Sequence, residues 1–257
     1  MPSDFGHPFL AFPGVHSFAH RGGTESAPEN SLAAFAAAVE LGMPYLETDV
    51  HLTADGVMVA FHDDQLDRVT DMAGKIVDLP WSEVARARIG GTEPIPTMDQ
   101  VLESFPATRI NVDAKSHEVV VSLAECLRRH DALDRVCVGG FSDKRLARLR
   151  GLLGDGLCTS AGPRETAAFM AGVKLPGFRI PADAAYRCLQ IPVRQAGLEL
   201  VTPATVGAAH ANGLAVHVWT VDDPVEMHRL LDLGVDGIMT DRPSVLRAVL
   251  EDRGQWV

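Results

Sequence analysis

The stretch from Val15 to Asp63, VHSFAHRGGTESAPENSLAAFAAAVELGMPYLETDVHLTADGVMVAFHD, decides the fold class. It contains a strand-like apolar run at 15–19, an alanine-rich helical pattern at 31–41 and a second strand-like run at 45–52. Residues 56–61, after the turn at Asp55-Gly56, continue the sheet or form a short return strand. A strand, a helix and a strand in this order predict an α/β protein with parallel strands.

The same alternation continues along the chain after an irregular segment, residues 63–96, rich in Asp, Gly and Pro. Predicted strands lie at 109–114, 136–139, 157–159, 215–221 and 237–240. Predicted helices lie at 97–103, 117–130, 143–153, 164–171, 204–212, 225–233 and 243–250. Three short strand candidates, 178–181, 188–193 and 198–201, fall in the region that is hardest to assign.

These elements add up to eight strand–helix units. The chain has 257 residues, close to the typical length of a (β/α)8 TIM barrel, about 250 residues. We therefore predict a TIM barrel in a single domain, residues 1–257, with a small insertion after the second strand at about 63–96. A doubly wound open sheet is the alternative, but no GxGxxG loop follows the first strand.

Composition restricts the class of protein further. The 23 basic and 34 acidic residues give a net charge of −11, and no cluster of Lys and Arg suggests a nucleic-acid site. A phosphate-bearing small molecule remains compatible, because a few local cations can reverse the field inside one cleft. The four cysteines lack CxxC spacing, which favours buried thiols. No apolar run approaches the length of a membrane span, so we expect a cytoplasmic protein, of undetermined oligomeric state.

Polar residues follow the predicted strands at the end where barrel enzymes carry their active sites. His20 and Arg21 follow the first strand, and Glu47 and Asp49 end the second. The remaining candidates are His62 after the return segment, Asp113 and Lys115 at the end of strand 109–114, and Trp219 and Asp241 near the ends of the last two strands.

Glu47 and Asp49 are separated by one residue, so both side chains point to the same face of an extended strand. Two carboxylates that converge in a barrel mouth repel each other unless a cation joins them. Asp113, from the neighbouring strand, is positioned to supply a third oxygen ligand. The sequence thus predicts a metal site, with a solvated strand end or a structural ion pair as the alternative.

Two histidines and two cations complete the candidate set. His20 and His62 each follow an apolar run and are candidates for general acid–base catalysis, although a lone histidine at a strand end is often only a hydrogen-bonded surface group. Arg21 and Lys115 are candidate phosphate partners, or partners of nearby carboxylates. Trp219 is either barrel packing or a pocket wall. The segment Asp241-Arg242-Pro243 is expected to end the last strand and cap the last helix, a mainly structural role.

These residues resemble the glycerophosphodiester phosphodiesterases. The resemblance rests on blocks that span nearly the whole chain in the family's order: Ala19-His20-Arg21-Gly22, Pro28-Glu29-Asn30-Ser31, Glu47-Thr48-Asp49-Val50, Phe61-His62-Asp63, Leu66-Asp67-Arg68-Val69-Thr70, Val218-Trp219-Thr220-Val221 and Thr240-Asp241-Arg242-Pro243.

The resemblance implies a TIM barrel with an insertion after the second strand. It also implies one divalent cation, Ca2+ or Mg2+ with Mn2+ as a further candidate, at Glu47, Asp49 and Asp113. His20 and His62 match the family's acid/base pair, Arg21 and Lys115 its phosphate contacts, and Trp219 an aromatic residue near the alcohol. The family usually has Glu at the position of Asp113, so the shorter carboxylate bears on metal preference.

The expected reaction is metal-dependent hydrolysis of a small-molecule glycerophosphodiester to sn-glycerol 3-phosphate and an alcohol. The nucleophile is either water or the neighbouring glycerol hydroxyl, which would give a cyclic phosphate. A phosphodiesterase that acts on lysophospholipids or other lipid phosphodiesters is the alternative. A catalytically silent barrel is disfavoured by the pair of histidines, and metal-dependent amide hydrolysis is disfavoured because no His-x-His pair follows the first strand.

Overall fold

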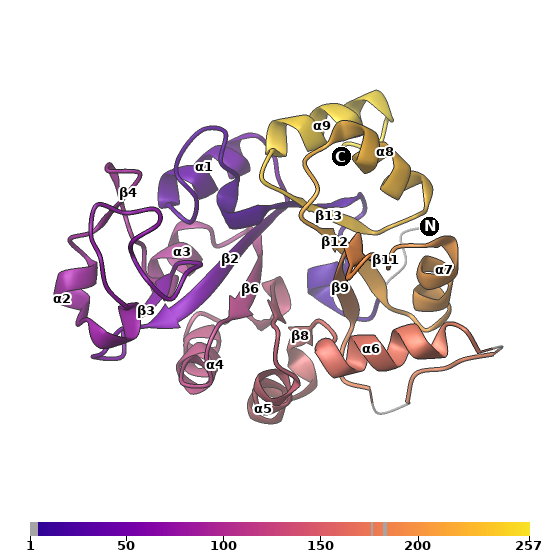
Figure 1. Ribbon diagram of the computed structural model, residues 1–257, viewed down its shortest axis with the longest axis horizontal. Coiled ribbons are helices and arrows are strands. Elements are labelled where there is room, and N and C mark those ends of the chain that lie inside the picture. Colours follow the sequence, from indigo (N-terminus) through magenta and orange to yellow (C-terminus); the bar gives the residue numbers. More distant parts are fainter. Residues whose placement is uncertain (1–4, 176, 182–183) are drawn as a thin grey trace.

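Eight parallel strands form the centre of the molecule in the computed structural model, which describes residues 5–175, 177–181 and 184–257 (Figure 1). Neighbouring strands follow the order β8-β7-β6-β2-β1-β13-β12-β9. Their bounds are His16–Ala19 (β1), Tyr45–Leu52 (β2), Arg109–Ala114 (β6), Val136–Gly139 (β7), Cys158–Thr159 (β8), Cys188–Pro192 (β9), Ala215–Trp219 (β12) and Gly237–Thr240 (β13).

The two edge strands of this order, β8 and β9, lie next to each other and nearly close the barrel. Ser160 and Cys188 form a parallel bridge. The amide of Arg187 donates to the carbonyl of Thr159 at 2.9 Å, and the amide of Ala161 donates to the carbonyl of Cys188 at 2.9 Å. The predicted (β/α)8 barrel is therefore confirmed, and the open doubly wound sheet is wrong.

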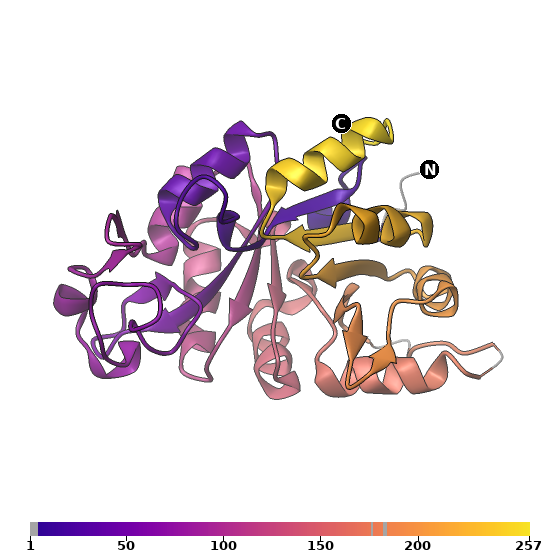
Figure 2. The same cartoon turned by 45° about the horizontal axis from the view of Figure 1, so that its top comes forward.

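Helices cover the outside of this barrel (Figures 1 and 2). They are Leu32–Glu40 (α1), Met98–Ser104 (α3), Val119–Arg129 (α4), Asp143–Leu153 (α5), Pro163–Gly172 (α6), Pro203–Ala211 (α7), Pro224–Asp232 (α8) and Pro243–Asp252 (α9). Ser31 caps α1 by accepting from the amide of Ala34, and Thr97 and Gln100 form the capping box of α3. Such caps explain why the predicted helix starts agree closely with the observed ones.

The predicted insertion is built on β3 (Met58–Ala60), a short return strand antiparallel to β2. It continues through α2 (Trp81–Val84), β4 (Arg88–Ile89) and β5 (Glu93–Pro94), with a 3-10 turn at Ile76–Asp78. A small core of its own, which includes Leu66 and Ile89, supports it. The segment projects beside the barrel at the left of Figures 1 and 2. That residues 1–257 form one domain stays a prediction.

The segment between α6 and α7 is where the predicted elements fail. Of the three strand candidates, 188–193 becomes β9, and 198–201 contributes only β11 (Leu198–Glu199), which pairs with β10 (Arg194–Gln195) in a hairpin. Residues 178–181 are not a strand. The amide of Ile180 donates to the Asn212 side chain, and the Phe178 ring packs against Phe169, so this backbone has no strand partner to pair with.

The amino-terminal end of the barrel is closed by a 3-10 turn, Pro8–Leu10, whose Phe9 and Leu10 are buried. The Tyr45 hydroxyl donates to the Phe9 carbonyl at 2.8 Å. Further 3-10 turns lie at His20–Gly22, Leu133–Arg135 and Gly154–Gly156. All four cysteines are buried thiols, as predicted. No helix among the described residues is long and apolar enough to cross a membrane, and a cytoplasmic location stays a prediction.

Two buried histidines share a hydrogen bond inside this closed end. His16 Nδ1 lies 3.0 Å from His217 Nε2, and both rings pack against Phe18 or Tyr45. Burial, reinforced by His217, lowers the pKa of His16 to about 3. The native protein therefore keeps His16 neutral at pH values where the unfolded chain binds a proton. The stability that this provides is present above about pH 6.5 and is lost as the pH falls toward 3.

We therefore predict that His16 makes the unfolding free energy fall by about 2 kcal/mol between pH 7 and pH 5. Urea unfolding of the wild type and of His16→Gln at several pH values in this range measures how the unfolding free energy changes with pH. A loss of stability that is the same at every pH does not affect this comparison. Between pH 7 and pH 5 the unfolding free energy of the variant should fall by about 2 kcal/mol less than that of the wild type. The exposed His117→Gln serves as the control, and equal slopes for His16→Gln and the wild type would contradict the prediction.

Candidate active site

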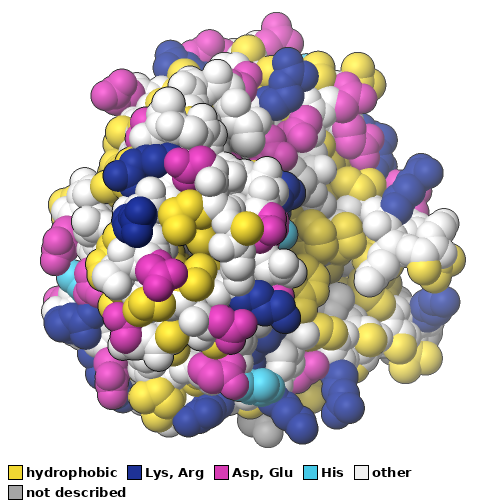
Figure 3. Space-filling model, turned by 60° about the vertical axis from the view of Figure 1, so that its left-hand side comes forward, with side chains coloured by type: hydrophobic (Ala, Val, Ile, Leu, Met, Phe, Trp, Pro, Cys, Tyr) yellow, Lys and Arg dark blue, Asp and Glu magenta, His cyan; other side chains and the backbone are white. Residues whose placement is uncertain are grey.

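A cavity of about 680 Å³ lies at the carboxyl ends of the barrel strands. All of the candidates that the sequence singled out, apart from Asp241, line it: His20, Arg21, Glu47, Asp49, His62, Asp113, Lys115 and Trp219. Figure 3 shows a hollow with hydrophobic side chains on its walls, on the side that carries the insertion, with acidic and basic side chains interspersed around it. The fold thus brings together residues that are up to 199 positions apart in the chain.

Three carboxylates meet at one wall of the cavity because β2 and β6 pair in parallel. Asp49 is in register with Asp113, and Glu47 lies two residues earlier on the same face of β2. All three side chains are buried. The Lys115 ammonium contacts two of them, at 2.6 Å from Asp49 Oδ1 and 3.0 Å from Asp113 Oδ2.

The electrostatics of this wall are dominated by burial and mutual repulsion. Burial, together with the charge of Asp49, raises the pKa of Glu47 to about 7. Burial acts to lower the pKa of Lys115, but Asp49 and Asp113 overcome it and raise that pKa above its ordinary value. The cluster therefore holds a lysine firmly charged and would gain from further positive charge.

The chemistry of the three carboxylates fits a divalent cation. Asp49 Oδ2 and Asp113 Oδ1 are buried and have no hydrogen-bond partner within the described part of the chain. Carboxylate oxygens are the ligands that Ca2+ and Mg2+ prefer. In this structure the Lys115 ammonium lies between the two aspartates and contacts both.

Arg21 enters the cavity on a 3-10 turn that directly follows β1. Its backbone has a positive φ of 53°, and its amide donates to Glu47 Oε2 at 3.0 Å. The guanidinium donates to Glu29 Oε1 at 3.0 Å, and its Nε lies 3.8 Å from Asp49 Oδ2. Arg21 therefore stabilises the carboxylate cluster through a backbone hydrogen bond and through the positive charge of its guanidinium.

His20 is hydrogen-bonded to a carboxylate through Nδ1, and its Nε2 lies near a second carboxylate without a hydrogen bond to it. Nδ1 lies 2.7 Å from Asp241 Oδ1, and Nε2 lies 3.8 Å from Glu47 Oε2. Burial acts to lower the pKa of His20, but Glu47 and the hydrogen bond to Asp241 raise it. As predicted, the segment Asp241-Arg242-Pro243 follows the end of β13 and starts α9, with Arg242 at the N-cap. The Asp241 side chain has a further role that was not predicted, because it contacts and orients the His20 ring.

His62 is held in a similar way on the insertion side. Its Nδ1 lies 2.5 Å from Asp63 Oδ1, and Arg68 Nε donates to the other oxygen of Asp63 at 2.5 Å. His51 on β2 donates from Nε2 to the backbone carbonyl of His62 at 3.0 Å.

The opposite wall of the cavity is apolar. Trp219 packs edge-on against Phe141, with ring centroids 5.7 Å apart, and also contacts the core at the amino-terminal end of the barrel. Both interpretations of Trp219 therefore apply, since it packs and it lines the cavity. Further apolar side chains come from α6, β9 and the β10–β11 hairpin, namely Pro163, Ala167, Met170, Ile191, Pro192, Leu198 and Leu200.

Sequence reasoning missed the acidic partners of the catalytic candidates. Asp241 lies 221 positions from His20, so only the meeting of β1 and β13 in the barrel reveals the contact. Asp63 and Glu29 stand inside the family motifs, but the sequence alone does not predict their contacts with His62 and Arg21. The signal available for them was local, because Asp63 follows His62 directly and Glu29 is eight positions from Arg21.

Comparison with known proteins agrees with this geometry. Residues 20–245 match the model of the Glycerophosphoryl diester phosphodiesterase family. "Probable glycerophosphodiester phosphodiesterase 2" of Mycobacterium tuberculosis is 40% identical over 99% of this chain and 98% of its own length. The chain belongs to the glycerophosphoryl diester phosphodiesterase family. It is thereby assigned to a family of phosphodiester hydrolases, which generally depend on a divalent metal.

Two further similar proteins have names that refer to different substrates or products, one to a lysophospholipid and the other to sn-glycerol-3-phosphate. "Lysophospholipase D GDPD1" of Homo sapiens is 28% identical over 91% of this chain and 85% of its own length. A phosphodiesterase of Oleispira antarctica, solved in complex with the product sn-glycerol-3-phosphate, shares the fold with a TM-score of 0.76. It is 24% identical and covers 93% of this chain and 97% of its own.

The central position of Lys115 gives a stability prediction. Replacing it in Lys115→Met leaves buried carboxylates without their cation, so the unfolding free energy should fall by about 3 kcal/mol when divalent ions are chelated. The exposed Lys144→Met should change it by less than about 0.5 kcal/mol. Urea unfolding in EDTA measures both. Equal stabilities for the two variants would show that Lys115 does not neutralise the cluster.

Proposed function

We propose that this protein hydrolyses glycerophosphodiesters to sn-glycerol 3-phosphate and an alcohol, with a divalent cation and two histidines as general acid and base. The observation that carries the proposal is the joint placement, in one cavity, of three buried carboxylates, two cationic side chains and two histidines that are each fixed by an acidic partner. Membership of the family supports the same reaction.

Glu47, Asp49 and Asp113 would hold the cation, with Ca2+ or Mg2+ as the expected ion and Mn2+ as a further candidate. When bound, such an ion neutralises phosphate oxygens and makes the phosphorus more electrophilic. The buried oxygens Asp49 Oδ2 and Asp113 Oδ1, which have no hydrogen-bond partner in the described residues, support this ligand set. Asp113 is one methylene shorter than glutamate, which restricts how far its oxygens reach.

Arg21 and Lys115 would bind the phosphate group. The Arg21 Nε is buried without a hydrogen-bond partner in the described residues, so this donor is available to a phosphate oxygen. The Lys115 ammonium is fixed between two carboxylates and stays charged. Both groups would stabilise the negative charge that grows on the equatorial oxygens in the transition state.

The histidines would move the protons. In both rings Nδ1 contacts a carboxylate, Asp241 for His20 and Asp63 for His62, so Nδ1 carries a proton and Nε2 is the atom that exchanges one with the substrate. One imidazole would accept a proton from the attacking hydroxyl group while the other donates a proton to the departing alkoxide. General acid–base catalysis of this kind typically raises the reaction rate about 10²–10⁴-fold.

The proposal is tested by the release of glycerol 3-phosphate from glycerophosphocholine, using metal-stripped protein with Ca2+, Mg2+ or Mn2+ added back. We expect release that requires the ion and that falls at least about 100-fold in His20→Ala and in His62→Ala, with unchanged circular dichroism. The exposed His117→Ala is the matched control. Folded wild-type protein that releases no product with any of the three ions would contradict the proposal.

A second candidate function is the hydrolysis of lysophospholipids. The apolar wall favours it, because Leu198 is 69% exposed and Phe141 65% exposed, yet both face the cavity. Exposed apolar side chains around a polar site are typical of a site that receives an acyl chain or another apolar group. The human relative named lysophospholipase D supports the same alternative.

The wall gives a prediction that separates the two substrates. In Leu198→Asp, the kcat/KM for lysophosphatidylcholine relative to that for glycerophosphocholine should fall about tenfold, because a charge replaces apolar surface beside the acyl chain. Val225→Asp, at another exposed apolar position, is the control and should leave the ratio unchanged. A wild type that hydrolyses only glycerophosphocholine would exclude the lipid substrate.

A further inference from the structure

Arg68 connects two acidic side chains that come from different parts of the chain. Its Nη2 and Nη1 donate to Glu29 Oε1 at 2.6 Å and to Glu29 Oε2 at 3.0 Å. Its Nε and Nη2 also donate to Asp63 Oδ2 at 2.5 Å and to Asp63 Oδ1 at 3.1 Å. One planar guanidinium thus fixes two carboxylates at once, which a lysine ammonium cannot do with the same geometry.

Each of these carboxylates also contacts a residue of the candidate active site. Glu29 Oε1 accepts from Arg21 Nη1 at 3.0 Å, and Asp63 Oδ1 lies 2.5 Å from His62 Nδ1. Arg68 itself does not line the cavity that contains the candidate catalytic residues. The Arg68 network, made of Arg68, Glu29 and Asp63, therefore links a phosphate-binding candidate to an acid–base candidate from outside the cavity.

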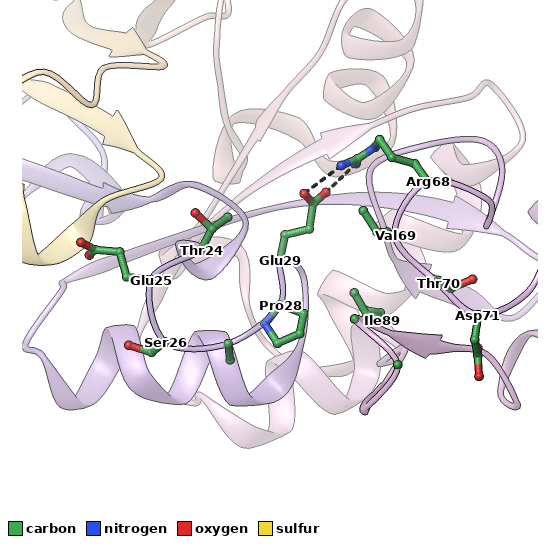
Figure 4. A pocket seen from close by; sticks show the side chains of 13 residues that line it. Thr24, Glu25, Ser26, Pro28, Glu29, Arg68, Val69, Thr70, Asp71 and Ile89 are labelled. Atoms are coloured by element: carbon green, nitrogen blue, oxygen red, sulfur yellow. Dashed lines mark hydrogen bonds and ion pairs between the residues drawn. The ribbon is translucent and has the colours of Figure 1, made fainter.

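The loop that carries Glu29 and the insertion that carries Arg68 pack directly against each other. Glu29 belongs to the loop between β1 and α1, whereas Arg68 belongs to the insertion, and Figure 4 shows the two side chains meeting across a second hollow. The insertion packs closely on this loop at Gly90, which has a φ of +60°. A side chain there would place its Cβ 2.7 Å from the Pro28 ring. Only glycine permits this approach.

The network keeps both carboxylates charged. The hydrogen bonds from Arg68 are the main cause that lowers the pKa of Asp63 to about 2. Burial acts to raise the pKa of Glu29, but the hydrogen bonds from Arg68 and the charge of Arg21 lower it. Two ionised acceptors are therefore available, one to orient the Arg21 guanidinium and the other to orient the His62 ring.

We propose that Arg68 is a positioning residue that fixes Arg21 through Glu29 and His62 through Asp63, so that the insertion sets phosphate binding and proton transfer together. The inference rests on the proposed function, since it assigns the Glu29 contact to phosphate binding and the Asp63 contact to proton transfer. Mutation should therefore separate the two contacts. Loss of Glu29 weakens phosphate binding, and loss of the Asp63 charge slows the chemical step.

The test measures two quantities in the same variants of the full chain, with the divalent ion held constant. Calorimetry gives the Kd of sn-glycerol 3-phosphate, and turnover of glycerophosphocholine gives kcat. Glu29→Ala should raise the Kd about tenfold. Asp63→Asn should lower kcat about 10–100-fold and change the Kd less than about twofold. Arg68→Ala should show both losses.

Matched controls and the stability of each variant exclude a general structural effect. Glu40→Ala lies at the end of α1, the helix that follows the Glu29 loop, and Asp64→Asn lies next to Asp63; both residues are exposed. Both should behave as the wild type. If Glu29→Ala and Asp63→Asn changed the Kd and kcat in the same proportion, or if Arg68→Ala matched the controls, the inference would be overturned. A wild type without turnover or product binding would instead refute the proposed function.

Discussion

The burial of negative charge at the carboxyl ends of β2 and β6 is the constraint on which the rest of the site depends. Parallel pairing places Asp49 beside Asp113, and the alternation of β2 adds Glu47 on the same face. Removing three carboxylates from water is costly unless positive charge accompanies them. The Lys115 ammonium and the Arg21 guanidinium provide that charge here, and the Arg21 amide adds a hydrogen bond to Glu47.

This constraint explains the arrangement of the residues around the cluster. His20 and His62 each have one ring nitrogen fixed by an acidic partner, which leaves the other nitrogen for the substrate. The side of the cavity away from the charges is apolar, from Trp219 to Leu198. The cavity therefore combines a charged end, where we propose that the phosphate binds, with an apolar surface, which we propose selects the alcohol.

Much of the fold was predictable because local signals agreed with the tertiary structure. The strands 109–114, 136–139 and 237–240 match β6, β7 and β13, and the local sequence around Thr97 is typical of the capping box that starts α3. Prediction failed where tertiary contacts override the local pattern. Residues 178–181 are apolar enough for a strand, but their backbone bonds to the side chain of Asn212 instead.

The candidate site was predictable in its membership but not in its connections. Strand-end positions identified His20, Glu47, Asp49 and Asp113 as neighbours, because a barrel gathers these ends. No local pattern connects His20 with Asp241, or shows that Arg68 in the insertion contacts Glu29 of the first loop. Those contacts depend on how distant segments pack, so only the three-dimensional structure reveals them.

Direct titration of Ca2+ and Mg2+ into metal-stripped protein tests the central claim most directly. The charge balance of the cluster predicts that the wild type binds one ion per chain and that Asp49→Asn, which keeps the shape of the side chain but removes its charge, binds at least about 10-fold more weakly. Folded wild-type protein that binds neither ion, or an Asp49→Asn variant of unchanged affinity, would contradict the account of this site.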